Sequence, residues 1–424
     1  MSAWRIAYSA LVCALLPAAL ARLAWRGRRE PGYREHVGER FGRYRAPRPR
    51  EPLIWVHAVS VGETRAAEPL VRALAAAYAD HRILLTHMTP TGRRTGAAVF
   101  DEGVLQSYLP YDYPAAVARF LEHYRPRAGV LLETEIWPNL VHGCKARGIP
   151  LYLVNARLSA KSARAYGRFA ALSREAFAAL TAVAAQTNGD AGRLRELGAS
   201  GVHVTGNLKF DATLDPAQLE LGRARRATYG ARRVLLAAST RDGEEALLLD
   251  ALSLLPADVL LVIVPRHPQR FDEVAALIGV KAIAHQRLSR AEPLAPRTRV
   301  LLGDSMGEMT AHYAACDLAF IGGSLLPFGG QNLIEACAAG RPVLIGPHTY
   351  NFAEAAAKAI EAGAALRAAT AEDVMRTASA LFADPVELQR MGQRGVEFTH
   401  AHRGATARVM EVLEGVMRKG DEKM

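Results

Sequence analysis

The feature that most constrains this chain is an alternation of short apolar runs with alanine-rich amphipathic patterns, repeated in two series. Such alternation is typical of a parallel sheet with helices on both faces. We therefore predict an α/β fold with two tandem Rossmann-like, doubly wound domains. The first series predicts strands at residues 53–59, 83–88, 107–110, 129–132, 151–155, 182–186 and 202–205. The second predicts strands at residues 234–238, 259–264, 282–285, 300–302, 318–321 and 342–345.

The length of 424 residues suits two domains better than one core. The stretch DATLDP at 211–216 is typical of a linker. We expect a membrane anchor at 1–30, an N-terminal domain at 31–211 and a C-terminal domain at 212–424. In doubly wound sheets ligands bind beyond the carboxyl ends of the strands, so functional residues are expected directly after strands, in a cleft between the domains.

An apolar run, IAYSALVCALLPAAL, occupies residues 6–20 and is followed by Arg22, Arg26, Arg28 and Arg29. Residues 1–50 hold 11 Arg and 3 Glu, a net charge of +8 out of +11 for the whole chain. A basic excess concentrated beside an apolar segment indicates an anionic membrane surface, whereas a nucleic-acid-binding protein would carry it on a folded domain. We expect no nucleic-acid partner.

Positive charge after an apolar run tends to stay in the cytoplasm. The chain is therefore predicted to lie at the cytoplasmic face of the inner membrane, held by a single N-terminal anchor. A cleaved signal peptide, suggested by Ala19-Leu20-Ala21, and a buried helix are the alternatives. The uninterrupted apolar run is about 22 Å long as a helix, short for a bilayer core of about 30 Å, so full spanning stays open.

Three acidic or basic groups follow predicted strands of the first series. Glu63 follows the first strand, where a carboxylate can act as a general base or simply complement a helix N-terminus. Glu133 and Glu135 follow the fourth; on an extended chain they would point the same way and would need a cation or a shared proton. Lys209 follows the seventh and suits a phosphate or carboxylate partner.

In the second series, too, candidate functional residues directly follow predicted strands. Arg266 follows the most apolar strand between Pro265 and His267-Pro268, and a guanidinium there can bind a phosphate. A glycine-containing stretch, 303–308, follows another strand. The stretch from Gly322 to Glu335 joins a glycine-rich loop to a predicted helix, NLIEACAAG, whose first N–H groups could hold a phosphate while Glu335 bonds a ribose.

Two motifs are absent. The chain has no Asp-x-Asp pair and no GxxxxGK[ST]. Cys13, Cys144, Cys316 and Cys337 are scattered without metal or disulfide spacing. We therefore expect no metal, no cofactor and a reducing compartment.

The motifs together resemble the 3-deoxy-D-manno-octulosonic acid (Kdo) transferase family. The matching stretches are YREHVGERFG, WVHAVSVGE, LLTHMTPTGR, LPYD, ETEIWPNL, NARLSAKS, AQTNGD, TGNLKFD, VPRHP, GDSMGEM and FIGGSLLPFGGQNLIEACAAGRPVLIGPHTYNF, in order from residue 33 to residue 352. Their number and order make the resemblance specific.

The resemblance implies the glycosyltransferase-B fold and metal-independent transfer of Kdo from CMP-Kdo to the tetra-acyl disaccharide bisphosphate precursor of lipid A, in lipopolysaccharide biosynthesis. It implies that Glu63 is the catalytic base and that Glu133 and Lys209 form a charge-stabilising pair, with Glu135 left as the alternative acid. It also implies contacts with CMP from Pro265, Arg266, Met306, Gly307, Glu308, Asn332, Leu333, Ile334 and Glu335.

Two other functions stay open. One is another glycosyltransferase-B-fold enzyme that uses a UDP-sugar, or a sugar-nucleotide epimerase. The other is a membrane-bound scaffold on an inactive fold. The number of Kdo residues transferred and the oligomeric state are not encoded in these motifs.

Overall fold

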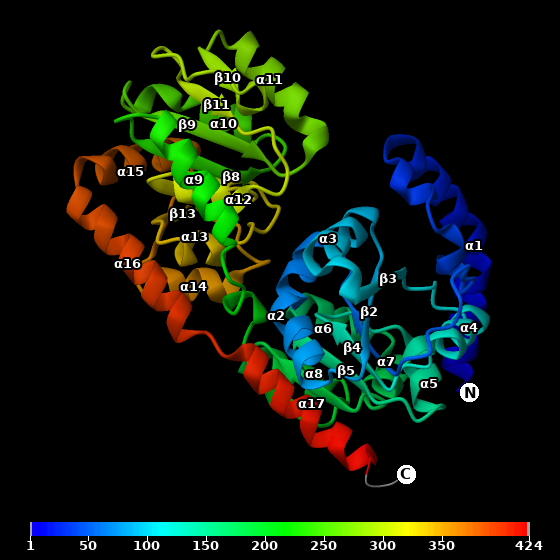
Figure 1. Ribbon diagram of the computed structural model, residues 1–424. Helices are drawn as coiled ribbons and strands as arrows, with labels where there is room; N and C mark the ends of the chain where they lie inside the picture. Colours follow the sequence, from blue (N-terminus) through cyan, green and yellow to red (C-terminus); the bar gives the residue numbers. More distant parts are fainter. Residues whose placement is uncertain (1, 422–424) are drawn as a thin grey trace. The chain divides into compact units, whose positions relative to one another are not determined.

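A computed structural model describes residues 2–421, except for the side chains of 29, 101 and 415–421. The chain divides into two compact units (Figure 1). Unit 1 contains the described residues up to Ala212 and those from Arg403 onward, and unit 2 is Thr213–His402. Both are α/β, as the sequence predicts.

Unit 1 is built on a seven-stranded parallel sheet in the order β3-β2-β1-β4-β5-β6-β7. Its strands are β1 Leu53–His57, β2 Arg82–His87, β3 Val104–Tyr108, β4 Ala128–Leu132, β5 Leu151–Ala156, β6 Ala182–Ala185 and β7 Val202–Val204. Its helices are α1 Ala3–Arg29, α2 Val61–Ala77, α3 Pro90–Phe100, α4 Pro114–Tyr124, α5 Pro138–Lys145, α6 Ala160–Gly167, α7 Ala170–Phe177, α8 Asn188–Glu196 and α17 Ala405–Asp421. Short 3-10 turns are η1 Pro31–Arg34, η2 Val37–Phe41, η3 Asp101–Gly103 and η4 Leu208–Phe210.

Unit 2 repeats this plan with a second seven-stranded parallel sheet, in the order β10-β11-β9-β8-β12-β13-β14. Its strands are β8 Val234–Thr240, β9 Leu260–Pro265, β10 His285–Arg287, β11 Val300–Leu302, β12 Leu318–Ile321, β13 Val343–Ile345 and β14 Ala365–Arg367. Its helices are α9 Pro216–Thr228, α10 Glu244–Asp250, α11 Phe271–Val280, α12 Met309–Ala315, α13 Ile334–Ala338, α14 Ala353–Glu361, α15 Ala371–Ala383 and α16 Pro385–Ala401. Its 3-10 turns are η5 Leu252–Leu254, η6 Pro268–Arg270 and η7 Leu288–Arg290.

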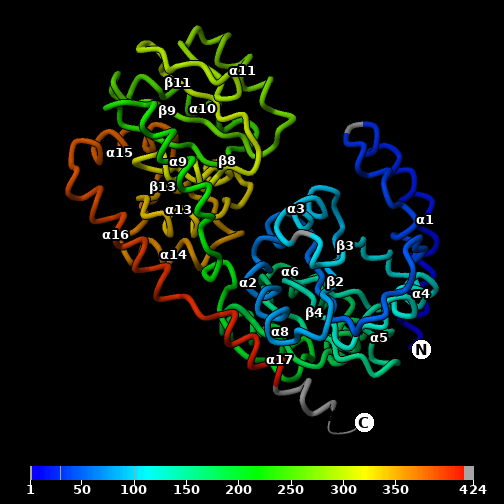
Figure 2. The backbone as a smooth tube through the Cα atoms, in the orientation of Figure 1, coloured from blue at the N-terminus to red at the C-terminus, as the bar shows by residue number. Residues whose placement is uncertain are grey.

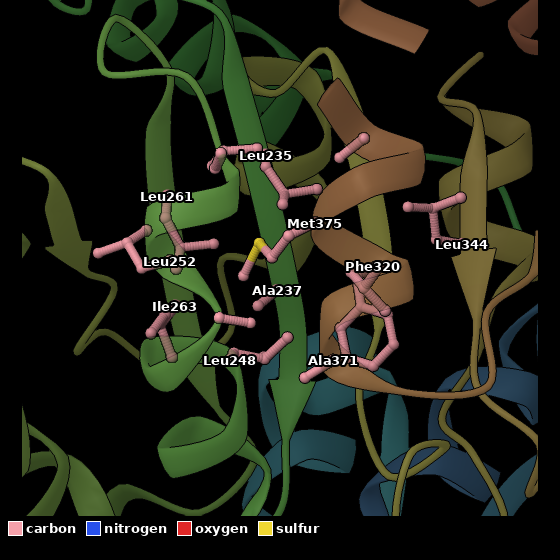
Figure 3. Packing of buried hydrophobic residues seen from close by; sticks show 14 of the residues in the cluster. Leu235, Ala237, Leu248, Leu252, Leu261, Ile263, Phe320, Leu344, Ala371 and Met375 are labelled. Atoms are coloured by element: carbon pink, nitrogen blue, oxygen red, sulfur yellow. The ribbon is translucent and has the colours of Figure 1, made fainter. Parts of the chain in front are cut away.

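The central strands are apolar along their whole length because both faces of each sheet are covered. In β1, Trp55 belongs to the core beneath α4, α5, α7 and α8, whereas its neighbours Ile54 and Val56 belong to the core beneath α2, α3 and α17. In unit 2 the core between the sheet and α10, α11, α15 and α16 includes Phe320 and Met375, which Figure 3 shows among leucines of β8, β9 and α10. Continuous burial of this kind favours parallel strands.

The last helix, α17, departs from the predicted domain boundary. Residues 212–424 were expected in one C-terminal domain, but residues 403–414 pack on unit 1 (Figure 2). Ala405, Val409 and Leu413 recur every fourth residue, so they form one apolar stripe, and they are buried in the unit 1 core that α2 covers. The Asp211 carboxylate accepts hydrogen bonds from the backbone N–H of Gly404, at 2.7 Å, and of Thr406.

The N-terminal helix, α1, is the one helix of the described chain that is long and apolar enough to cross a membrane, with a mean hydropathy of 1.8 over its best window. Large apolar side chains are exposed along it: Trp4, Ile6, Leu11, Leu15, Leu20 and Trp25. Its first turns nevertheless make polar contacts with unit 1. The Tyr8 hydroxyl donates to Asp112 at 3.0 Å, and the Ser9 hydroxyl donates to Asn139 at 3.0 Å.

Candidate active site

The strand order of unit 1 reverses between β1 and β4, which pair directly. Connections from these two strands leave in opposite directions, so a crevice opens beyond their carboxyl ends, where doubly wound proteins bind ligands. Glu63 follows β1 and Glu133 follows β4. The topology therefore places these two predicted residues at the switch point of the sheet.

Glu63 lies in the first turn of α2. Its Oε2 accepts the backbone N–H of Val59 at 2.8 Å, and its Oε1 accepts the Ser60 hydroxyl at 3.3 Å. Burial, and next the nearby Glu133 carboxylate, raise the pKa of Glu63 to about 8. Glu63 thus lies at the N-terminus of α2 with a pKa close to neutral pH, the range in which a general acid or base works best. Gly62 precedes it within the helix, and a side chain at that position would meet open space.

Glu133 and Lys209 are brought together by the fold. Their Oε1 and Nζ atoms are 3.0 Å apart, and both side chains are largely buried. Glu133 has a φ of +59°, a left-handed conformation that is uncommon outside glycine and often marks a functional site. The expected extended geometry of Glu133 and Glu135 is therefore wrong. Glu135 turns away and accepts the Trp137 indole N–H at 3.1 Å.

The Lys209 segment is held by Asn155, a residue whose part sequence reasoning did not find. Asn155 is the penultimate residue of β5, has a φ of +51° and is completely buried. Its Oδ1 accepts the backbone N–H of Leu208 at 3.0 Å, which fixes η4 and hence the start of the lysine side chain. A short polar side chain that tolerates a left-handed backbone is the available signal for such a position.

His87 supports the turn that carries Glu63. It ends β2, and its Nδ1 is 3.0 Å from the carbonyl oxygen of Ala58. Burial lowers the pKa of His87 to about 4, so the imidazole is neutral at pH 7, and a hydrogen bond to that carbonyl requires its proton on Nδ1. Two contacts thus hold the turn between β1 and α2. His87 contacts the Ala58 carbonyl, and the Glu63 carboxylate accepts the Val59 N–H.

In unit 2, Arg266 directly follows β9, and Pro265 is its last, buried residue. The backbone N–H of Arg266 donates to Thr240 at 2.9 Å, so the end of β9 is tied to the end of β8. Burial, and next the charge of Arg241, lower the pKa of Arg266. Arg241 follows β8 and was not among the predicted residues, although its place after a central strand is the same signal that selected Arg266.

The stretch Met306–Glu308 forms a turn before α12. Met306 is 57% exposed and Gly307 has a φ of +80°, which suits glycine. The Glu308 carboxylate accepts hydrogen bonds from the Ser305 hydroxyl at 2.6 Å and from Arg225 at 2.7 Å. Its side chain is thus oriented by an arginine of α9 that sequence reasoning did not find.

The stretch Asn332–Glu335 differs from its prediction. The helix α13 begins at Ile334, so Asn332 and Leu333 precede it, and Asn332 Oδ1 already accepts the Ile334 N–H at 3.1 Å. Glu335 Oε1 accepts the Thr310 hydroxyl at 2.6 Å. Glu335 therefore reaches the first turn of α12, next to the Met306–Glu308 turn, and its Oε2 accepts no hydrogen bond from the described residues.

The N–H groups of the glycine-rich loop are also engaged. Glu244, completely buried in the first turn of α10, accepts the backbone N–H of Gly323 at 2.6 Å and of Leu325 at 2.9 Å. A protein carboxylate thus occupies two N–H groups of the loop itself. The phosphate was expected on the N–H groups of the helix that follows, where the Ile334 N–H is taken by Asn332. Among the described residues, no group of three or more His, Cys, Asp or Glu side chains is placed to hold a metal ion.

Two doubly wound parallel sheets in tandem define the glycosyltransferase-B fold class. Solved structures share it: UDP-GlcNAc 2-epimerase from Neisseria meningitidis, 15% identical, matches with a TM-score of 0.60 over 86% of this chain and 100% of its own. A glycosyltransferase from Rickettsia africae, 13% identical, matches with a TM-score of 0.60 over 87% and 99%. At these identities the likeness establishes the fold alone.

Sequence comparison gives the family. A family model described as 3-deoxy-D-manno-octulosonic-acid transferase (kdotransferase) matches residues 35–212. The 3-deoxy-D-manno-octulosonic acid transferase of Bordetella pertussis is 47% identical over 93% of this chain and 96% of its own length. That of Haemophilus influenzae is 37% identical over 98% and 99%. The chain belongs to the 3-deoxy-D-manno-octulosonic acid transferase family, and it is a glycosyltransferase.

Proposed function

We propose that this enzyme transfers Kdo from CMP-Kdo to a hydroxyl of the tetra-acyl disaccharide bisphosphate precursor of lipid A, in lipopolysaccharide biosynthesis. The observation that carries the proposal is Glu63, a carboxyl with a raised pKa at the switch point of unit 1, beside the Glu133–Lys209 pair. The names of the two relatives above state transfer of 3-deoxy-D-manno-octulosonic acid, which supports Kdo as the group transferred.

In this proposal Glu63 takes the proton of the acceptor hydroxyl as the hydroxyl oxygen bonds to the anomeric carbon of Kdo. The bond between that carbon and the phosphate oxygen breaks, and CMP leaves with the electron pair. Negative charge accumulates on the departing phosphate, so a fixed cation lowers the barrier. Lys209, oriented by Glu133, is the cation that we propose for this role in unit 1.

CMP binding is assigned to Pro265, Arg266, Met306–Glu308 and Asn332–Glu335. They lie at or after the ends of β9, β11 and β12, and Glu308 and Glu335 converge on α12. Arg266→Ala should weaken CMP binding by about 1.5–3 kcal/mol, the range for a hydrogen bond to a charged group. Calorimetry with CMP measures this, and an unchanged affinity would move the phosphate site elsewhere.

The same calorimetric titration, made with CMP and with UDP, tests the choice of donor. The alternative function is an enzyme of this fold that uses a UDP-sugar. CMP and UDP differ in base and in phosphate number, so their affinities distinguish the two functions. The protein should bind CMP at least about tenfold more tightly than UDP, a difference of about 1.4 kcal/mol. The reverse preference would favour the alternative donor.

Activity should persist when EDTA replaces any added divalent salt. The chain lacks an Asp-x-Asp pair, and guanidinium and ammonium groups can stabilise the single phosphate of the donor. Initial rates with and without EDTA should agree within about twofold, a barrier difference below about 0.5 kcal/mol. Loss of activity that magnesium restores would contradict this part of the mechanism.

We place the enzyme at the cytoplasmic face of the inner membrane, attached through α1. This helix exposes apolar side chains and carries Arg22, Arg26, Arg28 and Arg29 near its end. Both features favour binding to an anionic bilayer surface. Tyr8 and Ser9 contact polar residues of unit 1, which supports a helix that lies along the surface in preference to one that crosses the bilayer. The lipid acceptor would be reached from the same surface.

Deleting residues 1–30 should leave CMP affinity unchanged, because the assigned contacts belong to unit 2. It should lower activity on precursor in anionic vesicles at least about tenfold more than on precursor in detergent, since attachment raises the local concentration of acceptor. Vesicle flotation with both activity assays measures this. A truncated enzyme that still floats at high salt, with full vesicle activity, would place attachment elsewhere.

A further inference from the structure

The end of β8 is the switch point of unit 2, just as β1 is in unit 1. The strand order reverses between β8 and β12, which pair directly. Arg241 follows β8, and the glycine-rich loop from Gly322 follows β12. From this position we infer that Arg241, together with Arg266, binds an oxyanion of the donor. The inference rests on the proposed function and extends it, because no role has been assigned to Arg241.

The Arg241 side chain is held in place by the loop opposite. Its guanidinium carbon lies 4.7 Å from the centre of the Phe328 ring, a cation–π contact. Its stem lies against Gly323, where an added Cβ would come within 3.3 Å of Arg241 Cγ. Its backbone N–H donates to Glu244 at 2.9 Å. The guanidinium is therefore fixed at the carboxyl edge of the sheet.

Arg241 and Arg266 form an uncompensated pair of positive charges. Neither guanidinium has an ion-pair or hydrogen-bond partner among the described residues, and both side chains are half-buried. Their neighbour Arg270 differs, because it contacts the carboxylates of Asp242, Glu245 and Glu273. Two partly desolvated like charges are costly without a counter-charge, so the pair favours an anionic ligand.

Two N–H groups of the glycine-rich loop beside Arg241 are already taken. Glu244 takes the N–H of Gly323 and Leu325 and is completely buried behind the loop. At this part of the loop an oxyanion therefore needs side-chain donors. Arginine suits this task, since its planar guanidinium bonds two oxygens of a phosphate or a carboxylate at once.

The donor offers two oxyanions of this chemistry, the phosphate of CMP and the carboxylate of Kdo. Three measurements on full-length protein distinguish them: calorimetry with CMP, steady-state kinetics with CMP-Kdo, and thermal shift with inorganic phosphate against chloride of equal ionic strength. Arg241→Ala is the main variant, and Arg241→Lys, which keeps the charge, should lose less. Arg233→Ala is the matched control, because Arg233 precedes β8 at its other end and lies over the Phe382 ring.

If Arg241 binds the phosphate, Arg241→Ala should raise the Kd for CMP at least tenfold and lose the stabilisation by inorganic phosphate. If it binds the carboxylate, the Kd for CMP should stay within twofold while the KM for CMP-Kdo rises at least tenfold. Either result supports the inference. An Arg241→Ala enzyme that matches Arg233→Ala in all three measurements would overturn it.

Failure of the proposed donor gives a different pattern. A wild-type enzyme that ignores CMP and CMP-Kdo would contradict the donor assignment. The thermal shift with inorganic phosphate then tests the Arg241 site independently of the donor. Loss of this stabilisation in Arg241→Ala supports the oxyanion site, and its persistence overturns the inference.

Discussion

Replacing Glu63 by glutamine should lower kcat by about two to four orders of magnitude, the usual contribution of a general base. The amide keeps the shape of the side chain and can still accept the Val59 N–H, so unit 1 should stay folded and CMP affinity should not change. Steady-state kinetics with saturating CMP-Kdo measures the effect. Glu68→Gln, on the same helix and paired with the exposed Arg72, is the matched control and should keep full activity.

The pH dependence gives this prediction a second readout. A base with a pKa of about 8 is protonated below that value, so wild-type kcat/KM should fall as pH decreases through 8. The folded pKa lies above the unfolded value of 4.5, so the folded state binds the extra proton and loses stability as pH rises through 8. Glu63→Gln should therefore gain Tm over wild type more at pH 9 than at pH 5. Near wild-type turnover with an unchanged pH profile would assign the base to another residue.

The second large effect is expected at Lys209. Lys209→Met keeps the length of the side chain but removes the charge 3.0 Å from Glu133, leaving that carboxylate without its ammonium partner. We expect kcat to fall about 100- to 1000-fold, the range seen when one transition-state donor is removed. Glu133→Gln should cost activity as well, and the double variant should lose less than the product of the two single losses, because both act through one pair.

Glu135→Gln is the control for this pair. Glu135 accepts the Trp137 indole N–H and does not pair with Lys209. A glutamine amide oxygen can still accept that N–H. The activity of Glu135→Gln should therefore stay within about tenfold of wild type, a barrier difference of about 1.4 kcal/mol. If Glu135→Gln were the more damaging change, with Lys209→Met near wild type, the roles given to the two acids would be reversed.

Much of the fold could be predicted because strands buried on both faces are apolar throughout and interrupt helical periodicity clearly. The thirteen predicted strand positions all correspond to observed strands, with ends shifted by a few residues. The strand Ala365–Arg367 was missed because it is a short edge strand with one buried residue in three. The return of α17 was missed because its stripe of Ala405, Val409 and Leu413 shows that a face is buried, but not which core buries it.

The candidate site also has residues that could be predicted from the sequence and residues that could not. Residues directly after strands, such as Glu63 and Arg266, could be selected because topology alone places them at the carboxyl edge. Partners chosen by three-dimensional proximity could not be selected. Glu244, Asn155 and Arg225 come from other elements, and each contacts a residue far away in sequence. Backbone conformation was equally out of reach, since a left-handed Glu133 turns Glu133 and Glu135 toward different partners.

Mass spectrometry of the lipid product tests the central claim most directly. Purified full-length enzyme would be incubated with CMP-Kdo and the tetra-acyl disaccharide bisphosphate precursor in detergent, with Glu63→Gln in parallel. The proposed function predicts that wild type yields the precursor carrying one or more Kdo residues with release of an equal number of CMP molecules, and that the variant leaves the precursor almost unmodified. A precursor that stays unmodified by wild type with CMP-Kdo, but gains a sugar from a UDP-sugar, would contradict it.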